Sequence, residues 1–307
     1  MGRRSRKKVP VVLDTDIGSD IDDTWALAML LKSPELDVRL VVSDTGNTTY
    51  RAKIVAKMLE AAERTDIPVG VGVHQSDKTG PQQEWVDKYQ LSDYDGEMRQ
   101  DGVKAIIDTI TNSDEPVTLV CIGPVPNVAA ALEREPEIAR NARFVGMHGC
   151  LRKSPWGYDG KKGGVLAEYN VSANPKALQK VFGAPWSVTV TPLDTCGFVV
   201  LKGEKYRVVR EYDDPVVKAL MENYMVWLKS REDWQQQFKT QSTILFDTVA
   251  VYLAFSEKLL VMQKLGVHVT DDGYTLIDNG AKAVNCAVEW KNLSAFEDLL
   301  VERLTGE

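Results

Sequence analysis

The stretch VVLDTDIGSDIDDTWALAML, residues 11–30, decides the fold. It begins as an apolar run typical of a buried strand, passes through an acidic turn, and continues as an apolar run typical of a helix. Five aspartates fall within ten residues of this turn: Asp14, Asp16, Asp20, Asp22 and Asp23. Two carboxylates ~4 Å apart repel by about 4 kcal/mol at an effective dielectric constant of roughly 20. The cluster therefore needs full solvation, raised pKa values or a bound cation.

Outward from this stretch, apolar runs alternate with amphipathic segments. Strands are predicted over residues 9–14, 37–44, 67–73, 116–123, 142–147 and 186–194. Helices are predicted over residues 24–33, 50–64, 102–113, 126–135 and 174–183. The last third adds helices over 214–230, 242–256 and 293–306 and a strand over 281–290. Continuous apolar strands alternating with helices indicate an α/β fold, a mostly parallel open sheet with helices on both faces.

Ligands bind such a sheet beyond the carboxyl ends of its strands. Polar residues gather there: the acidic cluster follows the first predicted strand, Asn47 the second, GPVPN (123–127) a central one, and His148 the next. We therefore expect a functional site at this edge. Two long irregular stretches, 74–101 and 148–167, carry aromatic residues that could stack on a ligand or simply pack the loops down.

The bulk properties narrow the class of protein. A chain of 307 residues with 44% hydrophobic and 26% charged residues is an ordinary globular composition. We predict one domain over residues 9–307, preceded by a basic segment, 1–8, that is disordered or foreign to the natural chain. A net charge of −7 argues against nucleic acid and anionic membranes as partners. The four cysteines are widely scattered, which favours a protein of the reducing cytoplasm. If a leader sequence has been removed, a periplasmic or secreted location is also compatible with the sequence.

Several explanations compete for the acidic cluster. Helix capping accounts for one or two of the last three aspartates, but not for Asp14 and Asp16 at the end of an apolar strand. A calcium-binding EF-hand loop is excluded because Gly18 stands at its fifth position and Trp25 at its twelfth. Gly18 also breaks the D-x-D-x-[TV] pattern of haloacid-dehalogenase-type phosphatases, which leaves them a weak alternative. A hard-cation site explains the whole cluster best.

Four segments, in order along the chain, resemble the motifs of the inosine–uridine-preferring nucleoside hydrolase family. They are DTDIGSDIDDTWAL (14–27), GPVPNVAAAL (123–132), AEYNVSANPKAL (167–178) and FDTVAVYL (246–253). The resemblance runs from about residue 9 to the C-terminus. It implies a calcium-dependent glycosidase that cleaves the N-glycosidic bond of a nucleoside or related riboside, and it suggests a homo-oligomer.

The resemblance also implies a role for each matching residue. Asp16 would contact the calcium ion and act as general base on the attacking water. Asp23, the backbone carbonyl of Ile122 and Asp247 would complete the metal site. The sugar hydroxyls would be bound by Asp22, Asn47, Glu168 and Asn170, and Asp14 would support the site. These oxygen ligands suit calcium, and a carboxylate-rich pocket stabilises the positive charge that develops on the sugar ring.

The chain also departs from the family pattern. Phe246 stands where many members have a histidine that is proposed to protonate the leaving base. Two extra residues precede the Asp22–Asp23 pair, and Lys162 lies near the place of a sugar-binding asparagine. His148 is held as a candidate acid or substrate contact. Two alternatives therefore stay open: a hydrolase of a different glycoside on the same scaffold, and a non-catalytic calcium-dependent sugar-binding protein.

Some candidate residues also have ordinary structural explanations. Asn170 could cap the helix that follows it, and Asn47 could make a turn. Asp247 could serve as the N-cap of its helix. The functional interpretation rests on the set of residues converging on one sheet edge.

Overall fold

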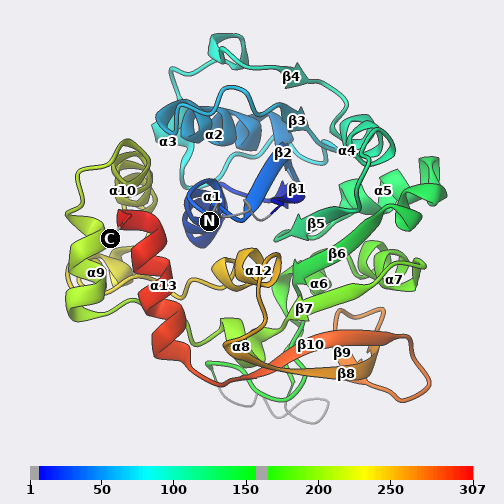
Figure 1. The fold of residues 1–307 in the computed structure, drawn as a ribbon. Helices are drawn as coiled ribbons and strands as arrows, with labels where there is room; N and C mark the ends of the chain where they lie inside the picture. The colour runs from blue at the N-terminus through cyan, green and yellow to red at the C-terminus, as the bar shows by residue number, and fades with distance from the viewer. Residues whose placement is uncertain (1–6, 157–164, 307) are drawn as a thin grey trace, which may run out of the picture.

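The computed structural model describes residues 7–156 and 165–306. Most of the predicted N-terminal segment, residues 1–6, and Lys162 lie outside this part of the chain. A ten-stranded sheet runs through the molecule in the order β4-β3-β2-β1-β5-β6-β7-β10-β8-β9 (Figure 1).

Most of the sheet is parallel, as predicted. The consecutive parallel strands are β1 (Val9–Thr15), β2 (Leu36–Ser43), β3 (Val69–Val71), β4 (Met98–Arg99), β5 (Val117–Cys121), β6 (Ala142–Met147) and β7 (Val188–Thr191). β10 (Ala283–Trp290) pairs parallel to β7, whereas β8 (Leu260–Val269) and β9 (Thr275–Ile277) add an antiparallel edge. The sequence did not predict β8, because its central residues are polar and exposed at this edge, as at Gln263 and Lys264.

Helices cover both faces of the sheet (Figure 1). On one face lie α1 (Asp22–Leu31), α2 (Thr48–Ala61), α10 (Pro215–Leu228), α12 (Thr248–Leu253) and α13 (Leu293–Thr305). On the other lie α4 (Gly102–Thr111), α5 (Pro126–Arg134) and α7 (Pro175–Gly183). Along β1, Val11 and Leu13 pack into the first layer and Val12 into the second. Burial on both faces explains why this strand is apolar at consecutive positions.

Short helices fill the connections. They are α3 (Gln83–Val86), α6 (Tyr169–Ala173), α8 (Leu193–Cys196), α9 (Gly203–Arg210) and α11 (Glu232–Gln235), with 3-10 turns at Leu91–Asp93, Pro136–Arg140 and Gln237–Lys239. In the described ranges, none of the helices combines the length and apolar character that a membrane crossing needs.

The helix predicted over residues 242–256 is shorter in the structure, where α12 begins at Thr248. The preceding residues bond to a distant segment instead: the Ser242 amide donates to the Leu201 carbonyl and the Leu245 amide to the Val199 carbonyl, each at 2.9 Å. These tertiary bonds replace the first helical turns. Asp247 consequently lies directly before α12.

The order of the strands locates the expected crevice. β1 lies between β2 and β5, so the chain builds the sheet outward in one direction through β2 to β4 and in the other through β5 to β7. In open α/β sheets such a switch point opens a crevice beyond the carboxyl ends of the two central strands. The acidic turn follows β1 there, and Ile122 follows β5.

Candidate active site

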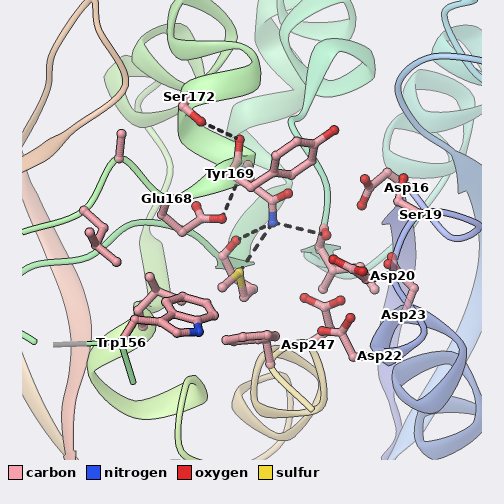
Figure 2. Close-up of a pocket in the computed structure, with 17 residues that line it drawn as sticks. Asp16, Ser19, Asp20, Asp22, Asp23, Trp156, Glu168, Tyr169, Ser172 and Asp247 are labelled. Atoms are coloured by element: carbon pink, nitrogen blue, oxygen red, sulfur yellow. Dashed lines mark hydrogen bonds between the residues drawn. The ribbon is translucent and has the colours of Figure 1, made fainter. Parts of the chain in front are cut away.

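A pocket of about 340 Å³ lies at this switch point (Figure 2). Figure 2 shows Asp16, Asp20, Asp22 and Asp23 on one side of it and Trp156 on the other. Leu166, Tyr169 and Phe246 also line the pocket, and the Phe246 ring packs against that of Trp156. The volume falls in the range of roughly 300–1,000 Å³ that is common for small-molecule sites. The pocket therefore joins an acidic wall to an aromatic one.

Three carboxylates form the tightest group in the acidic wall. Asp22 and Asp23 begin α1, Asp247 precedes α12, and each offers an oxygen within 4.8 Å of the others. All three side chains are buried. α1 and α12 pack against each other, which brings these distant parts of the sequence together. Asp22, predicted as a sugar ligand, thus lies among the candidate metal ligands.

Helix capping does not account for these carboxylates. The N-cap of α1 is Ile21, and Asp247, at the N-cap of α12, makes no side-chain bond to the helix backbone. The Thr15 hydroxyl donates to Asp23 Oδ1 at 2.6 Å, which leaves the other oxygen of Asp23 for a ligand. Asp247 does occupy the predicted N-cap position, but side-chain capping bonds do not explain why these three carboxylates are buried together.

Burial and mutual repulsion raise the pKa values of the whole cluster. Burial, together with the Asp20 carboxylate, raises the pKa of Asp22 to about 7. Burial and the Asp16 carboxylate hold the pKa of Asp23 well above its usual range, and burial and Asp22 do the same for Asp247. A bound cation would favour the ionised carboxylates and so lower these pKa values. The donors are all oxygens, so the site fits a hard divalent ion such as calcium.

Asp16 and Asp14 occupy different positions although they stand two residues apart. Asp16 lines the pocket, whereas Asp14 lies behind it, where its Oδ1 accepts a 2.8 Å hydrogen bond from Asn127 Nδ2. Burial raises the pKa of Asp16 to about 6, against a lowering by the Arg51 guanidinium. Burial raises the pKa of Asp14 to about 7, against a lowering by the Asn127 bond.

The AEYN motif supplies the far end of the pocket. Asn170 Nδ2 donates to the Ile122 carbonyl at 3.3 Å and to the Met147 carbonyl at 3.0 Å, as the dashed lines in Figure 2 mark. Both Ile122 and Asn170 line the pocket. Asn170 does not cap a helix, because Glu168 is the N-cap of α6 and Asn174 is the N-cap of α7. The structure thus places the predicted carbonyl ligand in the site.

Glu168 serves the helix and the pocket together. Its carboxylate accepts backbone amides of Asn170 at 2.7 Å, Val171 at 3.3 Å and Gly149 at 3.0 Å. Burial raises its pKa to about 7, against the lowering effect of these bonds. Three amides therefore orient a carboxyl group that lines the cavity.

Two predicted substrate ligands do not line the pocket. Asn47 caps α2: its Oδ1 accepts the Tyr50 amide and its Nδ2 donates to the Asp77 carbonyl, both at 3.0 Å. The buried His148 ring lies 3.0 Å from the Gly123 carbonyl through Nε2. Burial lowers the pKa of His148 to about 4, so the ring is neutral near pH 7. The helix cap and the core, respectively, hold these side chains away from the cavity.

The sequence did not assign the aromatic wall. Trp156 and Phe246 pack against each other with ring centroids 6.0 Å apart. The segment before Trp156 is fixed by Asp194, whose Oδ2 accepts the Leu151 amide at 2.8 Å and whose Oδ1 accepts the Lys153 amide at 3.3 Å. The only available signal for the wall was the aromatic content of the 148–167 stretch and the departure at position 246.

The chain matches a family of known proteins over nearly its whole length. The family model described as inosine-uridine preferring nucleoside hydrolase matches residues 11–303. The pyrimidine-specific ribonucleoside hydrolase RihA of Escherichia coli O7:K1 (strain IAI39 / ExPEC) is 28% identical, over 96% of this chain and 98% of that protein. RihA of Enterobacter sp. (strain 638) is 31% identical, over 74% of each chain.

Solved structures share the fold. A plant nucleoside hydrolase, the PpNRh1 enzyme, superposes with a TM-score of 0.80 at 23% identity, covering 97% of this chain and 99% of its own. A purine-preferring ribonucleoside hydrolase from Gardnerella vaginalis superposes with a TM-score of 0.77 at 22% identity, covering 97% and 98%. These matches extend over nearly the whole chain.

Proposed function

The chain belongs to the inosine-uridine preferring nucleoside hydrolase family and is a glycosidase that hydrolyses nucleoside N-glycosidic bonds, and we propose that it does so with bound calcium and with Asp16 as general base. One observation carries the proposal: a single cavity combines buried carboxylates with an aromatic wall. Hydrolysis of an N-riboside needs negative charge near the sugar ring, where positive charge develops, and an apolar surface for a flat leaving group. Family membership favours this enzyme over the non-catalytic sugar-binding alternative.

We propose that Asp16, Asp23, Asp247 and the Ile122 carbonyl hold the calcium ion. The closeness of Asp22 to Asp23 and Asp247 extends its proposed role from the sugar hydroxyls to the metal. When bound, calcium would orient the attacking water and lower its pKa.

The protein's own groups carry the remaining steps. Asp16 accepts the proton of the water, the water oxygen bonds to C1′ of the sugar, and the C–N bond breaks with its electrons leaving on the base. Glu168 and Asn170 hold the sugar in place, while the surrounding carboxylates stabilise its positive charge. Phe246 has no titratable group, so the leaving base takes its proton from another source.

Phe246 and Trp156 bear on the nature of the leaving group. Phe246 and Trp156 form an apolar surface where many relatives have a histidine, which favours a hydrolase of a different glycoside as the second candidate. A reducing-sugar screen over non-nucleoside glycosides tests this candidate directly. The homo-oligomer and the cytoplasmic location remain predictions.

A panel of purine and pyrimidine ribonucleosides tests the main proposal. With calcium supplied, we expect free ribose and free base from at least one of them, and loss of both products when a chelator is added. Asp247→Ala, which removes one proposed ligand, should release as little ribose and base with calcium as the wild type releases with chelator. Absence of ribose from every nucleoside in the panel with calcium present would count against the proposal.

A further inference from the structure

The loop that links β1 to α1, residues 16–20, has an unusual pattern of hydrogen bonds. We call these residues the acidic loop. Each of its five consecutive backbone carbonyls accepts a hydrogen bond from a side chain elsewhere in the chain. The donors are Arg51 to residues 16 and 17, Tyr50 to residue 18, Trp227 to residue 19 and Gln82 to residue 20. Side chains of three separate segments therefore determine where the loop carbonyls point.

Arg51 makes most of these contacts. Its guanidinium donates to the Asp16 carbonyl, to the Ile17 carbonyl at 3.0 Å and to Ser19 Oγ at 2.9 Å. Its Nε donates to the Thr45 carbonyl at 2.7 Å, which joins the loop to the end of β2. The residue is 8% exposed. All four acceptors are neutral oxygens. Arg51 therefore binds several backbone and hydroxyl oxygens of the loop and its neighbour at once, and does not form an ion pair with a single carboxylate.

The remaining contacts fix the other half of the loop. Tyr50 Oη donates to the Gly18 carbonyl at 3.0 Å, and Gly18 has a φ of +109°. A side chain at this glycine would begin 2.7 Å from the Tyr50 ring, so both the backbone angle and the close approach require glycine. Trp227 Nε1 donates to the Ser19 carbonyl at 3.1 Å, and Gln82 Nε2 to the Asp20 carbonyl at 2.8 Å.

The pattern has a physical consequence for the site. The loop carries carboxylates that repel one another, so without restraint it would relax toward conformations that separate them. The side-chain bonds hold the carbonyls while the side chains of Asp16 and Asp20 line the pocket. The chain has two more residues here than the family pattern, and they fall in this loop. Three of the four donor residues, Arg51, Trp227 and Gln82, contact Ser19 or Asp20.

We propose that Arg51, assisted by Tyr50, Gln82 and Trp227, is a positioning residue that holds the acidic loop in its metal-binding conformation before the metal arrives. The inference concerns the conformation of the loop, and its consequence for calcium affinity rests on the proposed function. Preorganised ligands bind a cation more tightly because less ordering is needed on binding.

Arg51→Met tests this inference with two readouts. Calcium affinity, measured by isothermal titration, should fall by roughly 10- to 100-fold, the usual cost of losing a residue that orients metal ligands. Hydrogen exchange of the backbone around residues 15–24, measured in calcium-free protein, should become faster. Arg51→Lys, which keeps the charge but has fewer donors in a less rigid geometry, should lie between the wild type and Arg51→Met in both measurements.

Arg143→Met is the matched control. Arg143 is partly buried and, like Arg51, donates to a hydroxyl and a carbonyl, Thr118 Oγ1 at 2.9 Å and the Ala254 carbonyl at 2.5 Å. It does not contact the acidic loop. This variant should keep wild-type exchange around residues 15–24 and wild-type calcium affinity. If Arg51→Met does not fold, Tyr50→Phe removes a single loop bond and replaces it in both measurements.

The outcomes separate this inference from the proposed function. Wild-type protein that binds no calcium would contradict the proposed metal site, while the exchange measurement would still decide the role of Arg51. Unchanged exchange in Arg51→Met, or an equal change in Arg143→Met, would overturn the inference whatever the calcium affinity is.

Discussion

At the scale of single residues, the surroundings of Asp16 are compatible with its proposed role as general base. Burial raises its pKa to about 6, and Arg51 limits the increase. A general base is most effective when its pKa lies near the working pH. Asp16 also lines the cavity, which the neighbouring Asp14 does not. Asp14 and Asp16 are chemically identical side chains, and their surroundings and positions give them different proposed roles.

Asp16→Asn should lower kcat by roughly 100- to 10,000-fold, the usual contribution of a general base. The measurement is ribose release at saturating nucleoside and calcium, with calcium binding checked separately. Asp77→Asn is the control, because it makes the same change at an exposed carboxylate that does not line the pocket. This control should keep kcat close to that of the wild type. A near-normal kcat in Asp16→Asn would exclude the proposed base.

At the scale of secondary-structure elements, α5 holds the ends of three strands together. Asn127, in its first turn, donates to Asp14 Oδ1 near the end of β1 and to the Ser43 carbonyl at the end of β2, at 2.8 and 3.0 Å. Its Oδ1 accepts the Val73 amide, beyond β3, at 2.8 Å. One buried amide thus supports the strand ends under the acidic loop.

Asn127→Leu should lower the free energy of unfolding by at least about 2 kcal/mol, because each buried partner left unpaired costs roughly 1–3 kcal/mol. Urea denaturation measures this difference. Asn141→Leu is the control: Asn141 donates to the carbonyls of Ile110 and Ser113 at 2.9 and 2.8 Å, but it is only partly buried. Water can reach those partners, so the loss should be smaller. Equal losses in the two variants would contradict the supporting role of Asn127.

At the scale of the whole molecule, the site exists only because distant segments meet. Asp22 and Asp23 come from the N-terminus of α1, and Asp247 comes from the segment that precedes α12 late in the chain. A cation bound by all three would join these parts of the fold. Metal binding should therefore stabilise the entire domain and not only the pocket.

Calcium should raise the melting temperature more at pH 8 than at pH 5. In the metal-free protein, Asp14 and Asp22, with pKa values raised to about 7, and Asp16, raised to about 6, keep protons that the unfolded chain has released. Their contribution to stability therefore falls as the pH rises from about 4 to about 7. Calcium requires the ionised forms, so its binding strengthens over the same range.

Thermal melts with calcium and with chelator at the two pH values measure this effect. At a free calcium concentration of about 100 times its Kd, the stabilisation should be about 2.7 kcal/mol. Magnesium, which demands a near-octahedral geometry, should stabilise less. A calcium effect that is equal at both pH values would contradict the proposal that Asp16 and Asp22 bind the metal.

The sequence by itself determined the fold class, most of the parallel strands and the edge of the sheet where the site lies. Strands that are buried on both faces have continuous apolar sequences, such as residues 9–14, and can be recognised from them. The site edge could be predicted because the carboxyl ends of parallel strands meet at one edge of the sheet. It also placed Asp16, Asp23, Ile122, Glu168 and Asn170 in one set, and all five line the pocket.

Only the tertiary structure decided which of the predicted metal and substrate ligands lie close together. It grouped Asp22 with Asp23 and Asp247, and it left Asn47 at a helix cap and His148 in the core. It also determined where α12 begins and brought Arg51 to the acidic loop. Periodicity and motifs report a residue's local environment, whereas the distance between residues far apart in the chain is set by how helices and strands pack.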